Sequence, residues 1–154
     1  MTAVGRSLLV AASYVFLLRP GPAGPEVLLH LRQHTGYTDG HWASLAGHVE
    51  EGETAFAAAV REAREEAAVE IDPAELRPLT TLHRITPGAG QREQRVDFFF
   101  TARRWSGDPV VAEPAKNAGF GWFSLGALPD PVVPHEAVVL GHLRAGSVPA
   151  VLVG

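Results

Sequence analysis

The segment GHVEEGETAFAAAVREAREEAAV, residues 47–69, decides how the rest of the chain is interpreted. Its apolar residues recur at the spacing of one helical face, so the sequence predicts a helix from Thr54 to about Ala67. Proline disfavours a helical conformation at the preceding residue, and Asp72-Pro73 therefore ends the helical region. The helix face expected to pack on the core consists of Phe56, Ala59, Val60, Ala63 and Ala67.

Acidic residues concentrate in and around this predicted helix. Nine of the 17 lie between Glu50 and Glu75. Glu62, Glu65 and Glu66 are spaced i, i+3 and i+4, which places them within an arc of about 100° beside the apolar face. Taken alone, such an arc is typical of a solvated helix surface on which glutamates pair with arginines.

The turn before the helix favours a second interpretation. Gly47 and Gly52 bound a turn that carries Glu53 toward the helical glutamates. Carboxylates that converge there would form an oxygen-rich pocket, and Mg²⁺ prefers oxygen ligands that are completed by water and substrate phosphate. The residues alone therefore indicate either a charged surface or a divalent-cation site.

This arrangement resembles the Nudix box of the MutT-like hydrolases, which reads Gly-x5-Glu-x7-Arg-Glu-aliphatic-x-Glu-Glu-x-Gly-aliphatic. Ala63 is smaller than the usual aliphatic residue, and Ala68 replaces the usual glycine. If the position of Ala68 needs a left-handed backbone, alanine costs about 1 kcal/mol there, although no acidic residue is lost. Seven of the nine specified positions match, namely Gly47, Glu53, Arg61, Glu62, Glu65, Glu66 and Val69.

The resemblance extends beyond the box and implies a fold. Residues 42–48 read WASLAGH, which is similar to the Trp-Ser-Leu-Pro-Gly-Gly-His approach of the family, and residues 113–116 and 122–129 resemble its downstream segment. The implied class is α/β: the Nudix fold, in which a mixed β-sheet is sandwiched between α-helices. We expect a single domain over residues 1–154, with its core at about 5–145.

The resemblance also implies an activity. Nudix hydrolases cleave the diphosphate bond of a nucleoside diphosphate linked to another group, with Mg²⁺, or alternatively Mn²⁺, as cofactor. The expected substrate is a small-molecule nucleotide, by default a (deoxy)nucleoside triphosphate that is cleaved to monophosphate and pyrophosphate. ADP-ribose or a nucleotide sugar is the runner-up, and a nucleotide-binding sensor without catalysis is the alternative from another class. The resemblance also allows a homodimer.

Within the box, the family pattern implies a role for each matching residue. Glu53 is expected either to bind the metal through water or to activate the nucleophile. Glu65 is also expected to be a catalytic residue. Arg61 is expected to orient a carboxylate through a bidentate pair. The metal-site residues expected in the box are Gly47, which lets the backbone approach the metal or phosphate, and Glu62, Glu65 and Glu66.

Outside the box, four residues are candidates for the site. Glu113 stands in a Pro-x-Lys context that resembles the segment in which relatives supply a further metal ligand, and a loop surface glutamate is the alternative. Lys116 is the only lysine and is a candidate phosphate contact. Tyr37 and Trp42 are candidates for stacking on a nucleobase, with packing in the core as the alternative for both.

The remaining elements follow from apolar runs and turn residues. Residues 96–100 are too apolar for a sheet edge, so their strand is expected to be central. The run at 8–18 is interpreted as a buried strand, with the apolar part of a signal peptide as the alternative. Strands are predicted at 8–18, 26–32, 42–49, 79–85, 95–102 and 120–123, the last with Trp122 and Phe123 in the core, and a helix at 135–143 that stops at Gly146.

Composition excludes several other classes. The 154 residues contain no cysteine, which excludes disulfides, Cys-ligated zinc, iron–sulfur clusters and a thiol nucleophile, and which fits a cytoplasmic protein. The net charge of −4 argues against nucleic acid or an anionic membrane as a partner. Val139 stands where a zinc-protease helix that begins at His135-Glu136 would need its second histidine.

Overall fold

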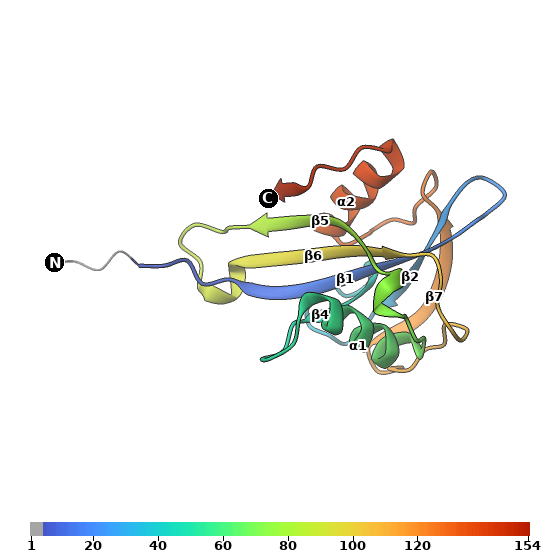
Figure 1. Cartoon of the computed structure of the whole chain (residues 1–154), viewed down its shortest axis with the longest axis horizontal. Coiled ribbons are helices and arrows are strands. Elements are labelled where there is room, and N and C mark those ends of the chain that lie inside the picture. The colour runs from blue at the N-terminus through green and yellow to red at the C-terminus, as the bar shows by residue number, and fades with distance from the viewer. Residues whose placement is uncertain (1–4) are drawn as a thin grey trace.

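The computed structural model describes residues 5–154, and Figure 1 shows the arrangement of its strands and helices. Single turns of 3-10 helix at Pro73–Glu75 and Gln91–Glu93 precede two of the strands. In chain order the elements are β1 (Val10–Arg19), β2 (Glu26–Arg32), β3 (Trp42–Ala43), β4 (Leu45–His48), α1 (Ala55–Ala67), β5 (Arg77–Arg84), β6 (Arg95–Ala102), β7 (Asn117–Ser124), α2 (Pro134–Ala145) and β8 (Val151–Val153).

Strand β1 organises the sheet because its two edges have different partners. On one edge it runs parallel to β6, which pairs with antiparallel β5, and β5 pairs with parallel β8. On the other edge its first half pairs with β4, and its end, at Leu18 and Arg19, pairs with β2. Strand β2 also pairs with β3 and β7. The mixed sheet therefore forks along one edge of β1, into β4 and β2.

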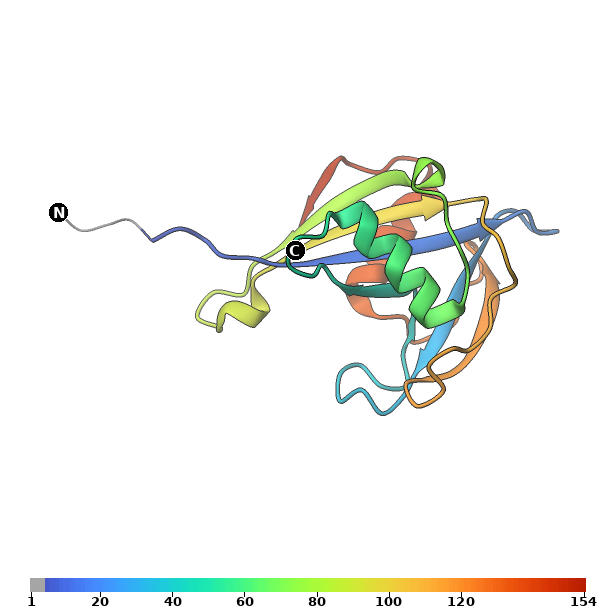
Figure 2. The ribbon, with the colours of Figure 1, turned by 60° about the horizontal axis from the view of Figure 1, so that its bottom comes forward.

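The two helices cover opposite faces of this sheet (Figure 1, Figure 2). Side chains alternate along β1, so Val15 and Leu17 join the core under α1, whereas Tyr14 and Phe16 join the core under α2. Helix α1 faces the sheet with small side chains, which let its backbone lie close to the strands. Its buried residues are Ala58, Ala59, Ala63 and Ala67.

Both ends of α1 are fixed by local hydrogen bonds. The Oγ1 atom of Thr54 accepts the N–H of Ala57 at 3.1 Å, as expected of an N-cap. At the other end Ala68 has φ 56° and ψ 31°, so the position at which the family has glycine is left-handed. The helix therefore ends well before Pro73. In the part of the chain that the structure describes, neither helix is long and apolar enough to cross a membrane.

The predicted α/β class and the sheet between two helices are confirmed, as is the central place of β6 between β1 and β5. One core assignment is wrong: Phe56 is 41% exposed, and its ring lies against Phe100 at a centroid distance of 4.8 Å while Ala58 is buried instead. The strand predicted at 42–49 is divided at Ser44 into β3 and β4. Strand β8 lies beyond the expected core limit and is not predicted, because three residues give no periodicity.

Candidate active site

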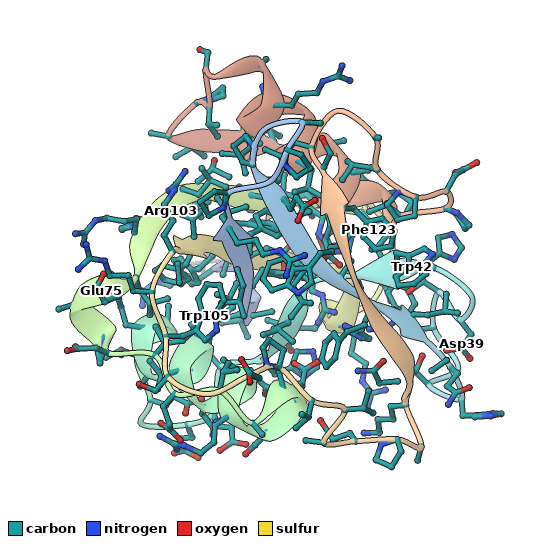
Figure 3. The ribbon with its side chains drawn as sticks, turned by 90° about the vertical axis from the view of Figure 1, so that its right-hand side faces the viewer. Asp39, Trp42, Glu75, Arg103, Trp105 and Phe123 are labelled. Atoms are coloured by element: carbon teal, nitrogen blue, oxygen red, sulfur yellow. The ribbon has the colours of Figure 1, made fainter. Side chains whose placement is uncertain are left out.

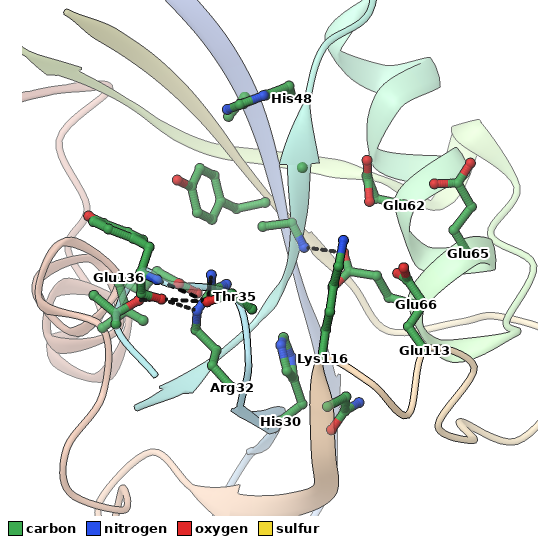
Figure 4. Close-up of a pocket in the computed structure, with 18 of the residues that line it drawn as sticks. His30, Arg32, Thr35, His48, Glu62, Glu65, Glu66, Glu113, Lys116 and Glu136 are labelled. Atoms are coloured by element: carbon green, nitrogen blue, oxygen red, sulfur yellow. Dashed lines mark hydrogen bonds between the residues drawn. The ribbon is translucent and has the colours of Figure 1, made fainter. Parts of the chain in front are cut away.

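A cleft of about 620 Å³ opens where β4 and β2 diverge from β1 (Figure 4). Its walls come from β1, β2, β4, α1, the first residue of β6, the loop before β3, the start of β7 with the segment before it, and the start of α2. The volume falls in the range of small-molecule sites in proteins. One side of the cleft carries the carboxylates of α1, and the opposite side carries residues that are distant from them in sequence.

Arg61 connects the turn after β4 to the acidic face of α1 through hydrogen bonds. Its Nε and Nη2 atoms donate to the two oxygens of Glu53 at 2.9 and 2.8 Å, which is a bidentate pair. Its Nη1 donates to Glu62 at 2.7 Å and to Glu65 at 3.1 Å, and its Nη2 also donates to the carbonyl of His48 at 2.9 Å. The two hydrogen bonds that Arg61 donates to Glu53 lower the pKa of Glu53 to about 2. One guanidinium therefore positions three carboxylates.

Gly47 makes room for one of these carboxylates. A Cβ at this position would overlap the carboxylate of Glu62, which reaches across from α1 to the backbone of β4. Gly47 is not among the residues with positive φ, so the site needs glycine there for space and not for an unusual backbone conformation. The close approach seats Glu62 in the cleft with its side chain only 13% exposed.

Glu66 lies deeper in the same wall. Its Oε1 accepts the N–H of Ala46 at 2.8 Å, which links α1 to β4 one residue before Gly47. Burial raises the pKa of Glu66 well above its usual range, and the nearby charge of Glu62 raises it further. Burial also raises the pKa of Glu62. The wall therefore holds two enclosed carboxyl groups, and burial disfavours the charged form of each.

Such a pair fits a divalent cation. Within residues 5–154 no group of three or more His, Cys, Asp or Glu side chains is already gathered at metal-ligand spacing. Mg²⁺ commonly takes only one or two protein carboxylates and completes its shell with water and phosphate oxygens. A cation between Glu62 and Glu66 would also offset the unfavourable effect of the Glu62 charge on Glu66. Glu65, whose side chain is 52% exposed, lines the cleft beside them.

Three of the four candidates outside the box line the cleft. Glu113 and Lys116 come from the segment before β7, and Figure 4 shows both near Glu66. The carbonyl of Glu113 accepts the N–H of Lys116 at 3.0 Å, which forms the turn that presents both side chains. Tyr37, in the loop between β2 and β3, is 54% exposed, and its ring centre lies 5.9 Å from the guanidinium of Arg32.

Trp42 is the fourth candidate, and it does not line the cleft. Its ring packs edge-on against Phe123 at a centroid distance of 4.9 Å. Figure 3 shows these two residues close together. This contact corrects the substrate-binding role expected for Trp42, because core packing, the alternative, is what the structure has. Phe123 and Trp122 pack in the two halves of the core as predicted, with Trp122 stacked on Trp105 at 5.9 Å.

The opposite wall of the cleft was not anticipated from the sequence. The Tyr14 hydroxyl lies 3.0 Å from Nε2 of His135, and burial lowers the pKa of His135 to about 4. Beside them is Glu136, only 2% exposed. One local signal was present: Val139 and Leu140 follow Glu136 at i+3 and i+4, so this acid stands on the buried face of α2.

The comparisons with known proteins agree with this geometry. The NUDIX domain model matches residues 8–143, and the matched segment contains both walls of the cleft. The chain belongs to the NUDIX domain family. The acidic wall is thus a Nudix box, and the protein is a Nudix pyrophosphohydrolase. No curated protein matches the sequence.

Solved structures of Nudix proteins share the fold. The MutT NUDIX hydrolase from Burkholderia pseudomallei is 26% identical, with a TM-score of 0.75 over 87% of this chain and 97% of that one. RenU, a Nudix hydrolase from M. smegmatis, is 26% identical, with a TM-score of 0.65 over 89% and 84%. The NUDIX domain of Shewanella oneidensis NrtR, which was crystallised with ADP ribose, is 18% identical with a TM-score of 0.70 over 90% and 88%, a likeness of fold alone.

Proposed function

We propose that this Nudix hydrolase cleaves (deoxy)nucleoside triphosphates to monophosphate and pyrophosphate, with Mg²⁺ held by Glu62 and Glu66. The observation that carries the proposal is the pair of enclosed carboxyl groups on one wall of a cleft that is large enough for one nucleotide. The sole lysine, Lys116, lies beside this pair, where a phosphate would bring negative charge (Figure 4).

The reaction requires water to attack a phosphorus atom that is surrounded by negative oxygens. Bound Mg²⁺ supplies charge neutralisation and alignment of the water with the leaving group. Glu65 is partly exposed at the cleft and accepts one hydrogen bond, from Arg61, so it retains capacity to accept a proton from water. Both oxygens of Glu53 are engaged by Arg61, and one also accepts the Glu50 N–H at 2.9 Å. We therefore assign Glu65 as the base and Glu53 as the residue that positions Arg61.

The substrate contacts follow from the same cleft. Lys116 donates to a phosphate oxygen, and Glu113 adds a carboxylate on the side of the metal ion. Tyr37 presents an exposed aromatic face at the entrance and stacks on the nucleobase. The base end of the substrate then lies toward the wall that contains Tyr14 and His135.

The test is a hydrolysis panel with and without Mg²⁺, in which phosphate and pyrophosphate products are read separately. The panel contains the common nucleoside triphosphates, ADP-ribose, nucleotide sugars and a dinucleoside polyphosphate. We expect Mg²⁺-dependent release of pyrophosphate from a triphosphate and a loss of at least a hundredfold in kcat in Glu66→Gln.

Glu70→Gln is the matched control, because Glu70 follows the same helix, pairs with the exposed Arg64 and lies outside the cleft. It should retain full activity. Release only from ADP-ribose or a nucleotide sugar would overturn the triphosphate assignment. A folded protein that binds nucleotide without turning over any member of the panel would make the chain a sensor.

A further inference from the structure

Glu136 is a buried acid that the proposed chemistry does not use. It is the third residue of α2, it is 2% exposed, and it lines the cleft on the side away from Glu62 and Glu66 (Figure 4). Within the described residues no arginine, lysine or histidine forms an ion pair with it, although buried carboxyl groups usually have such a partner.

The two oxygens of Glu136 have different surroundings. Oε1 accepts two hydrogen bonds from Ser44, one from its backbone N–H at 2.7 Å and one from its hydroxyl. Within residues 5–154 no group donates to Oε2. Three side-chain polar atoms of the described residues are fully enclosed without a hydrogen-bond partner, namely His30 Nδ1, His83 Nε2 and Asp97 Oδ1. Oε2 of Glu136 has no partner either but is not one of these enclosed atoms, so it retains access to the cleft. One oxygen is thus held by the protein, and the other is free for a ligand.

Burial, and not the balance of nearby charges, favours the neutral form of Glu136. Burial raises the pKa of Glu136 to about 7, against the opposing effect of the hydrogen bonds from Ser44. Arg32 on β2 favours the carboxylate, and Asp97 on β6 opposes it. The other titratable groups that face this region are Tyr14 on β1, His30 on β2 and His135 on α2, and burial lowers the pKa of both histidines to about 4, so neither supplies a cation.

The hydrogen bonds from Ser44 also decide where the proton resides. Because Oε1 accepts two donors, the proton of the neutral acid sits on Oε2, and its O–H is directed at the cleft. A donor in that place matches an acceptor on an uncharged part of the ligand. It does not match a phosphate group, because the phosphate-binding charges, Mg²⁺ and Lys116, are on the other side of the cleft.

We propose that Glu136, held by Ser44, is a specificity-determining residue that donates a hydrogen bond from Oε2 to a ring nitrogen or carbonyl oxygen of the nucleobase. This inference rests on the proposed function, because a nucleotide with its phosphates at Glu62 and Glu66 directs its base to this wall. Ser44 is a positioning residue: it does not touch the base, but it fixes which oxygen carries the proton.

The experiment measures binding and needs no turnover. Mg²⁺ complexes of the four α,β-methylene ribonucleoside triphosphates are titrated into the protein by calorimetry between pH 6 and 9. For the preferred base, the affinity of the wild-type protein should fall about tenfold per pH unit above pH 7, as the donor on Oε2 is lost. Glu136→Gln keeps an N–H donor that cannot ionise, so this fall should be absent.

A second variant keeps the inference testable if Glu136→Gln does not fold. Ser44→Ala removes one hydrogen bond that stabilises the carboxylate, so the pH midpoint of the wild-type fall should move upward. Ser124→Ala is the matched control, because the hydroxyl of Ser124 accepts a backbone N–H from Gly126 in a turn outside the cleft. Its midpoint should equal that of the wild type.

Three outcomes would overturn the inference. Glu136→Gln could show the same fall as the wild type, Ser44→Ala could leave the midpoint in place, or Mg²⁺-tripolyphosphate, which has no base, could show the same difference between wild type and Glu136→Gln. Failure of the proposed function is distinguishable: the panel would show no hydrolysis while the pH dependence of binding persisted.

Discussion

Replacing Ala68 by glycine should stabilise the protein, against the usual effect of this substitution in a helix. Ala68 ends α1 with φ 56° and ψ 31°. A left-handed backbone costs an ordinary L-residue about 1–2 kcal/mol, and glycine does not pay it. Glycine also gains about 0.4–1 kcal/mol of conformational entropy in the unfolded chain, which opposes the effect. The difference is a stabilisation of about 0.5–1 kcal/mol.

The assay is denaturant unfolding of the apo protein, supported by thermal melting, in which this difference corresponds to a rise in Tm of about 1–4 °C. Ala57→Gly is the matched control, because Ala57 is also exposed but lies inside α1 with helical geometry. It should lose roughly 0.5–1 kcal/mol. Because the side chain of Ala68 contacts neither the metal ion nor the substrate in the proposed site, kcat should not change in Ala68→Gly. Equal destabilisation by the two substitutions would refute the reasoning.

Three further predictions concern the cleft. Gly47→Ala should lower kcat/KM at least tenfold without unfolding the protein, because its Cβ would displace the Glu62 carboxylate, whereas Gly90→Ala, with φ −66° and open space around it, should have no effect. The Glu136 carboxyl keeps its proton in the folded state between its ordinary pKa of 4.5 and about 7, so the free energy of unfolding should fall by up to about 3 kcal/mol as the pH rises through this window. Denaturant titrations should show this fall to be smaller in Glu136→Gln, and equal falls would contradict it. Mg²⁺ with a non-hydrolysable nucleotide at about 100 times its dissociation constant should raise the free energy of unfolding by about 2.7 kcal/mol. A chelator should abolish the accompanying rise in Tm. Persistence of the rise with chelator would show that Mg²⁺ is not needed for binding.

The sequence predicted most of what depends on neighbouring residues. The period of α1, its start at Thr54 and the stop of α2 at Gly146 are local features, and each is present in the structure. The four box glutamates and Arg61 lie within one loop and one helix, so their clustering also follows from local geometry.

The rest of the site depends on contacts between distant residues. Tyr14 and His135 approach to 3.0 Å although 121 positions separate them, and Ser44 and Glu136 are separated by 92. No periodicity encodes such pairs, because the fork of the sheet at β1 brings them together. For the same reason the sequence left two alternatives open for Trp42. An aromatic residue near the box has local reasons to face a ligand or to pack in the core, and the pairing of β2 with β3 and β7 places Trp42 against Phe123.

The single lysine allows the cleft to be labelled selectively. Lys116 is exposed, lines the cleft, and carries the only side-chain amine in the sequence, which also contains no cysteine. Apart from a terminal amine, an amine-reactive fluorophore therefore labels the protein at one position, and an introduced cysteine adds a second, orthogonal position for a distance measurement. Protection of Lys116 from the reagent by a candidate nucleotide reports occupancy of the cleft directly, before any product of hydrolysis is known.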